Sequence, residues 1–159
     1  MDAIDLRLLD LVQRDSSLSH ERLGALAGAS ASAVHRRLKR LLGEGVIRGY
    51  AAIVDQARVG RPLSFVVALE IERKEPGSYD RLQRWLGAED AVQQAYNVTG
   101  SSDFVIVVTA TSIEEYDSLM DDMLRANPNI KKYNTNVVLR SFKQSRFVPV
   151  LPCEAFVGT

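Results

Sequence analysis

The chain has 159 residues, of which 46% are hydrophobic and 25% charged, and its formal net charge is zero. This composition is typical of an ordinary globular protein and excludes the disordered and fibrous classes. Acidic residues interrupt the N-terminal "MDAIDLRLLDLVQRD", and apolar runs such as "FVIVV" are too short to cross a membrane, so we predict a cytoplasmic protein without a membrane segment.

Three helices are predicted in the first 45 residues. Apolar residues at helical spacing indicate the first helix over about 2–15. Ser19 can cap a short second helix, and Ser30 can cap a third that ends near Leu42. Gly28 lies between them and permits the positive φ of a tight turn. Two short helices joined by such a turn predict a helix-turn-helix.

The third helix separates its apolar side chains from its basic ones. With successive residues about 100° apart, one stripe is apolar and the opposite side carries a serine and three cations. The stripe consists of Val34, Leu38, Leu41 and Leu42, and the opposite side of Ser32, Arg36, Lys39 and Arg40. Arg37 lies beside the stripe, where it can pair with an acid of the first helix. This layout is that of a DNA recognition helix.

Basic charge is concentrated around this helix. Residues 30–48 hold five basic residues and one acidic residue, and we interpret the cations as lacking the acidic i+4 partners of a salt-bridged surface helix. A solvated helix face is the alternative interpretation. In the DNA interpretation, the cations contact phosphates or guanine and the serines a base edge or a phosphate of double-stranded DNA. The predicted DNA-binding residues are Ser30, Ser32, His35, Arg36, Arg37, Lys39, Arg40 and Arg48.

The sequence pattern changes after Gly45. "VIRGYAAIVD" is rich in β-branched and aromatic residues and predicts a strand within a linker, and Gly60 and Pro62 mark a boundary. Beyond it, alternating and helical patterns predict the order β-α-β-β-α-β of a ferredoxin-like fold. The predicted strands are 64–72, 91–98, 103–111 and 131–142, and the predicted helices are 75–90 and 112–126.

These patterns predict an α+β protein in four parts. They are a helix-turn-helix domain over 1–45, a strand linker over 46–61, a ferredoxin-like domain for effector binding and dimerisation over 62–150, and an irregular tail over 151–159. The single cysteine, Cys153, lies in that tail; it excludes a disulfide scaffold, and we assign it no role.

One face of the predicted sheet is left uncovered, because both helices lie on the other face. The residues expected on it are mostly small and apolar: Val66, Ala68, Val105, Val107 and Val138. An exposed apolar face of this kind favours a homodimer interface. Two-fold symmetry would also pair the DNA-binding heads on two half-sites.

Two motifs resemble the Lrp/AsnC family of transcription factors, the leucine-responsive and asparagine-responsive regulators. After the third helix stand Leu41, Gly45, Ile47, Gly49, Tyr50 and Ala52, and the TGxxD turn holds Thr99, Gly100 and Asp103. The resemblance extends from about Asp2 to Pro149. It implies a ferredoxin-like domain that dimerises through its sheets, higher assemblies such as an octamer, and an amino-acid effector bound between dimers near the turn.

The same resemblance implies a set of effector-binding residues. Carried over by position, they are Gly100, Ser101, Ser102 and Asp103, with Asn136 and Val137 nearby. Asp103 would hold an α-amino group and turn N–H groups would bind the carboxylate. An ordinary hairpin turn is the alternative. Many family members have an acid or an aromatic residue where this chain has the two serines.

Two other functions remain as alternatives. An architectural, nucleoid-associated DNA-binding protein without an effector would use the same head and leave the turn as scaffold. Siroheme decarboxylases share the two-module build but rely on histidines in the second module, whereas His20 and His35 both lie in the first. We therefore predict no catalytic residue, no metal and no cofactor.

Overall fold

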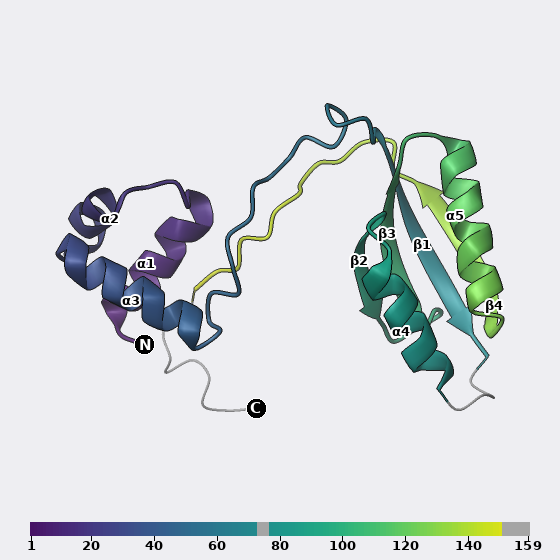
Figure 1. Cartoon of the computed structure of the whole chain (residues 1–159), viewed down its shortest axis with the longest axis horizontal. Coiled ribbons are helices and arrows are strands. Elements are labelled where there is room, and N and C mark those ends of the chain that lie inside the picture. The colour runs from purple at the N-terminus through teal and green to yellow at the C-terminus, as the bar shows by residue number, and fades with distance from the viewer. Residues whose placement is uncertain (73–76, 151–159) are drawn as a thin grey trace. The chain divides into compact units, whose positions relative to one another are not determined.

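The structure is a computed structural model that describes residues 1–72 and 77–150. The chain divides into two compact units. One contains Met1–Ala52 together with the described residues from Lys143 onward, and the other is Ile53–Phe142 (Figure 1). The predicted tail 151–159, with Cys153, lies outside the described residues.

Three helices form the first unit, as predicted: α1 (Ala3–Arg14), α2 (His20–Ala27) and α3 (Ala31–Gly43). Each begins at a side chain that accepts a free backbone N–H, namely Asp2, Ser19 and Ser30. Gly28 ends α2 in the left-handed region at φ 73°. The helices enclose a small core of Leu8, Val12, Leu23, Ala27, Val34 and Leu38.

The second unit has the predicted β-α-β-β-α-β order. Its elements are β1 (Leu63–Ile71), α4 (Ser78–Ala88), β2 (Val92–Asn97), β3 (Phe104–Ala110), α5 (Ile113–Ala126) and β4 (Ile130–Val137). The strands form one antiparallel sheet in the order β2-β3-β1-β4. Helices α4 and α5 lie against one face of it (Figure 1). This arrangement confirms the ferredoxin-like fold.

Strand alternation divides the sheet between core and open face. Phe65, Val67 and Leu69 of β1 are buried under the helices, where Phe65 stacks on Tyr116 with ring centroids 3.9 Å apart. The residues between them, such as Val66 and Ala68, are only half-buried on the opposite face. Their cross-strand neighbours there are Val107 and Val105 of β3, and Asn136 and Asn134 of β4.

The structure corrects the predicted strand of the linker. Residues 48–55 belong to no strand, and Ile53 is fully exposed. A strand needs a neighbouring backbone for its ladder, and no described segment of this chain pairs with these residues. For the same reason β4 ends at Val137 instead of continuing to residue 142.

The end of the described chain packs on α1. The Gln13 side chain accepts a hydrogen bond from the Val148 N–H at 2.8 Å and donates to the Val148 carbonyl at 3.1 Å. The Arg14 guanidinium lies 4.4 Å from the centre of the Phe147 ring. Through these contacts residues 143–150 group with the helical unit.

Within residues 1–72 and 77–150, no helix is long and apolar enough to span a membrane.

Candidate DNA interface and effector pocket

The polar side of α3 is exposed as predicted. Ser32, His35, Arg36 and Lys39 are exposed along the helix, with Ser30 at its start and Arg48 beyond its end. The Ser30 hydroxyl accepts the Ala33 N–H at 3.3 Å and lies 3.1 Å from the Ser32 hydroxyl. Among the described residues, Arg36, Lys39 and Arg48 have no acidic partner within salt-bridge distance.

Arg37 pairs with the first helix, as its position beside the apolar stripe suggests. Its Nη1 lies 2.7 Å from a carboxylate oxygen of Asp2 and 2.7 Å from one of Asp5. Asp2 and Asp5 also cap the start of α1 reciprocally. Arg37 thus connects α3 to α1.

Arg40 is also engaged by acids, which corrects the interpretation that the cations lack acidic partners. Its Nη2 donates to Asp5 at 2.7 Å, and its Nη1 lies 3.3 Å from Glu44, four residues on. Glu44 stands at position i+4 from Arg40 in the sequence and was overlooked as its partner, whereas the contact with Asp5 depends on how α3 packs against the start of α1.

Asp5 holds both arginines from a buried position. The residue is 1% exposed. Burial raises the pKa of its carboxyl, but hydrogen bonds from the Asp2 N–H and from Arg37 and Arg40 outweigh that effect and lower the pKa to about 2. The carboxylate is therefore charged at neutral pH, and it neutralises part of the positive charge of Arg37 and Arg40.

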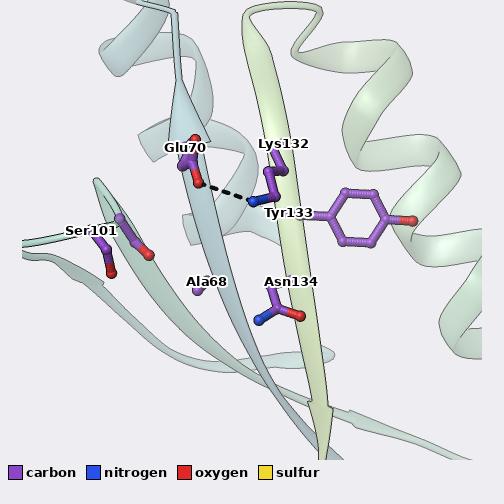
Figure 2. Close-up of a pocket in the computed structure, with 7 residues that line it drawn as sticks. Ala68, Glu70, Ser101, Lys132, Tyr133 and Asn134 are labelled. Carbon is purple, nitrogen blue, oxygen red and sulfur yellow. Dashed lines mark ion pairs between the residues drawn. The ribbon is translucent and has the colours of Figure 1, made fainter.

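A pocket of about 260 Å³ lies on the open face of the sheet in the second unit. It is lined by Ala68, Glu70, Ser101, Ser102, Lys132, Tyr133 and Asn134. Glu70 and Lys132 are cross-strand neighbours on β1 and β4, with carboxylate and ammonium 3.6 Å apart. Figure 2 shows these two side chains pointing toward each other, while the Tyr133 ring points away. The pocket thus presents one negative and one positive group side by side.

Two of the predicted effector residues, Ser101 and Ser102, line this pocket; the other four do not. Asn136 lies two cross-strand pairs beyond Asn134 along β4, opposite Val66. Val137 follows it as the last residue of β4 and is half exposed. Gly100 has φ 123°, which suits a tight turn.

Asp103 has structural partners within its own unit. Its carboxylate accepts the Ile71 N–H at 2.8 Å and the Tyr79 hydroxyl at 3.4 Å. Its backbone N–H donates to the Leu69 carbonyl at 2.8 Å. These bonds tie the turn to the end of β1.

Glu70, Lys132 and Asn134 were missed from the sequence. Only the β1–β4 register brings them together, and no local pattern specifies that register. In the described part of the chain, no group of three or more His, Cys, Asp or Glu side chains is placed to hold a metal ion.

Two family models match the chain. The AsnC-type helix-turn-helix domain matches residues 1–42, and the Lrp/AsnC ligand binding domain matches residues 64–148. The uncharacterized HTH-type transcriptional regulator y4tD of Sinorhizobium fredii is 36% identical over 150 residues, which are 94% of this chain and 89% of that protein. The transcriptional regulator AzlB of Bacillus subtilis is 31% identical over 155 residues, covering 94% of this chain and 96% of that one.

A solved structure shares the fold over both units. It is a transcriptional regulator from Neisseria meningitidis in complex with L-Met, with a TM-score of 0.86, 23% sequence identity and 96% of each chain covered. Neither the effector-free architectural protein nor the siroheme decarboxylase is favoured by these relatives. With both family domains matched in order, this chain belongs to the Lrp/AsnC family of DNA-binding transcriptional regulators.

Proposed function

We propose that this regulator binds double-stranded DNA through α3, with Arg36 and Lys39 as the direct cationic contacts. The observation that carries this assignment is the division of charge along α3. Arg37 and Arg40 are held by Asp5, whereas Arg36 and Lys39 are exposed without an acidic partner in the described residues. Guanidinium and ammonium groups of this kind contact phosphates or guanine.

The remaining predicted DNA-binding residues make smaller contributions to DNA binding. Ser30 opens α3, where free N–H groups attract a phosphate, and Ser32 can donate to a base edge. His35 and Arg48 flank the contact surface. Arg37 and Arg40 act mainly by fixing α3 on α1, since their guanidinium groups already donate to Asp5.

Salt dependence of DNA affinity tests this division. In Arg36→Ala and Lys39→Ala, each lost phosphate contact should lower the slope of log affinity against log salt by about 0.9. A lost guanine contact should cost about 1–3 kcal/mol on selected DNA and little on random DNA. Arg125→Ala, on α5 of the other unit, is the matched control. Unchanged affinity and slope in the double variant Arg36→Ala/Lys39→Ala would contradict the assignment.

A homodimer through the open sheet face is the second part of the proposed function. Val66, Ala68, Val105 and Val107 form an apolar centre there, and apolar linker residues such as Ile53 are exposed in the single chain. A two-fold axis would present two α3 helices to paired half-sites, and further dimers would give an octamer-like assembly. Light scattering should show a reduced mass for Val107→Lys but not for Ile113→Lys on α5.

The effector is proposed to be an amino acid in the 260 Å³ pocket. A zwitterion matches the adjacent charges, because its amino group can bind Glu70 while its carboxylate binds Lys132. Ser101, Ser102 and Asn134 supply hydrogen bonds around these charges. The L-Met complex of the Neisseria meningitidis regulator supports the same ligand class. Asp103 and Gly100 would then hold the turn rather than contact the ligand.

Thermal shift with each of the twenty amino acids tests the effector. Saturation at 100 times Kd should stabilise the native protein by about 2.7 kcal/mol. The shift should be lost in Glu70→Gln and Lys132→Met and kept in Lys131→Ala, an exposed neighbour outside the pocket. No shift with any amino acid would contradict an amino-acid effector and favour an architectural role.

Linkage would connect the effector to DNA. An amino acid that binds one assembly state more tightly shifts the population of that state, and with it the spacing of the heads. The proposed role requires no catalysis, and we place it in the cytoplasm, at the nucleoid.

A further inference from the structure

The two histidines of the chain lie side by side, one at the start of α2 and the other within α3. His20 and His35 are the two histidines of the sequence. His20 is the first residue of α2 and His35 lies on α3, yet their ring centroids are 5.2 Å apart with an interplanar angle of 64°. Both residues are exposed. Neither the DNA-binding role of Arg36 and Lys39 nor the effector pocket requires this contact.

The backbone on both sides of the histidine pair is firmly placed. The Ser19 side chain accepts the Arg22 N–H at 3.2 Å and so fixes the first turn of α2, which carries His20. On α3, buried Val34 and Leu38 set the rotation that points His35 toward α2. The Ala29 N–H donates to the Gly24 carbonyl at 3.0 Å and closes the turn between the helices. The two rings therefore meet edge to face, each on a helix whose backbone is fixed.

The spacing of the rings suits shared metal coordination. Imidazole nitrogens lie about 2.1 Å from zinc, so two rings on one tetrahedral ion have centroids about 5.3 Å apart. The observed 5.2 Å is close to this value. Because both residues are exposed, their side-chain torsions can turn one nitrogen of each ring toward a common point without disturbing the core.

We propose that His20 and His35 chelate one divalent transition-metal ion of the class that prefers imidazole: zinc, nickel or copper. Water completes the coordination, since no third His, Cys, Asp or Glu joins the pair in the described residues. The Glu21 carboxylate, next to His20 in the sequence, adds a nearby negative charge. Arg36 and Lys39 oppose this effect from α3, so the expected affinity is modest.

Metal binding at this pair would join α2 to α3 next to the recognition surface. The ion would bind the folded head and not a particular DNA sequence or effector. A failure of the proposed effector pocket would therefore not affect the proposed metal site, and the reverse also holds.

Calorimetric titration of untagged protein with Zn²⁺, Ni²⁺ and Cu²⁺ is the direct test, because a histidine tag would itself bind these ions. One ion per chain is expected for at least one of the three metals. Its affinity should fall at least tenfold in both His20→Gln and His35→Gln and should be unchanged in Cys153→Ser, which controls for thiolate binding. Circular dichroism would verify that each variant is folded.

Electron paramagnetic resonance of the copper-loaded protein is a second test, because it reports which atoms bind the ion. The nitrogen hyperfine pattern should report two imidazole ligands in the wild type and one in either histidine variant. No binding at millimolar metal, binding that survives His35→Gln, or a spectrum without two imidazole nitrogens in the wild type would overturn the assignment.

Discussion

Asp5 of α1 accepts a 2.7 Å hydrogen bond from Arg37 of α3, and its second oxygen accepts another of 2.7 Å from Arg40. One buried carboxylate thereby fixes the orientation of the recognition helix on α1. It also divides the basic residues of α3 into two that pair with acids, Arg37 and Arg40, and two without an acidic partner among the described residues, Arg36 and Lys39.

Replacing this carboxylate should destabilise the head. Asp5→Asn keeps the shape but removes the buried charge that Arg37 and Arg40 share, leaving them with Asp2 and Glu44, and we expect a loss of about 2–4 kcal/mol in the free energy of unfolding. Asp10→Asn, which breaks the exposed pair with Arg14, should cost less than about 1 kcal/mol. Urea unfolding followed by a probe in the helical unit would measure both. Equal costs for the two variants would contradict the role of Asp5.

The stabilisation from Asp5 should depend on pH with a defined sign. Its pKa falls from 3.8 to about 2 on folding, so the folded state binds fewer protons than the unfolded state in this range. The contribution is complete above about pH 4 and is lost as the pH falls toward 2; at 1.36 kcal/mol per pKa unit it amounts to about 2 kcal/mol. Between pH 5 and pH 2 the free energy of unfolding should therefore fall less steeply with decreasing pH in Asp5→Asn than in the wild type. Parallel curves would show that Asp5 does not titrate as described.

Gly24 in α2 should not tolerate a side chain. A Cβ at this position would lie 2.4 Å from the Ala29 carbonyl oxygen, a backbone atom of the turn before α3. Alanine normally stabilises a helix by about 1 kcal/mol over glycine, but here the clash should reverse the sign and cost about 1–3 kcal/mol. Gly43→Ala in α3 meets open space and is the matched control. A melting temperature that rises in Gly24→Ala would show that the turn can move.

The helices and strands were predictable because their signals are local. Ser19, Ser30 and Gly28 stand where a cap or a turn is needed, and the alternation of β1 needs no knowledge of the rest of the chain. The linker strand was not predictable in this way. Its β-branched residues favour an extended backbone, but a strand forms only when a neighbouring backbone supplies hydrogen-bond partners.

The sites were predictable only in part, because they depend on distances between segments. The exposed Arg36 and Lys39 follow from helix angles alone. The partnership of Arg40 with Asp5 depends on how α3 crosses α1, and the pairing of Glu70 with Lys132 depends on the register of β1 and β4. His20 and His35 were considered one at a time, and only the fold brings their rings together.

The contact of the chain end with α1 should depend on Gln13. Its amide makes both hydrogen bonds to the backbone of Val148, and these bonds are exposed, so Gln13→Ala should weaken the attachment by about 0.5–1.5 kcal/mol. Hydrogen exchange at the Val148 amide should become several times faster. Gln13→Glu keeps an acceptor for that amide and should retain part of the protection. Unchanged exchange in Gln13→Ala would mean that the Phe147–Arg14 contact alone holds the segment.

Asp103 distinguishes a scaffold from a ligand contact. Its carboxylate accepts the N–H of buried Ile71, and an unsatisfied buried N–H costs about 1–3 kcal/mol. Asp103→Ala should therefore lower the melting temperature of the protein without any amino acid present. Asp103→Asn keeps a carbonyl acceptor, so its melting temperature should fall less than that of Asp103→Ala. If Asp103→Ala leaves the ligand-free protein unchanged and abolishes only the response to an amino acid, Asp103 contacts the effector directly and its role in holding the turn is minor.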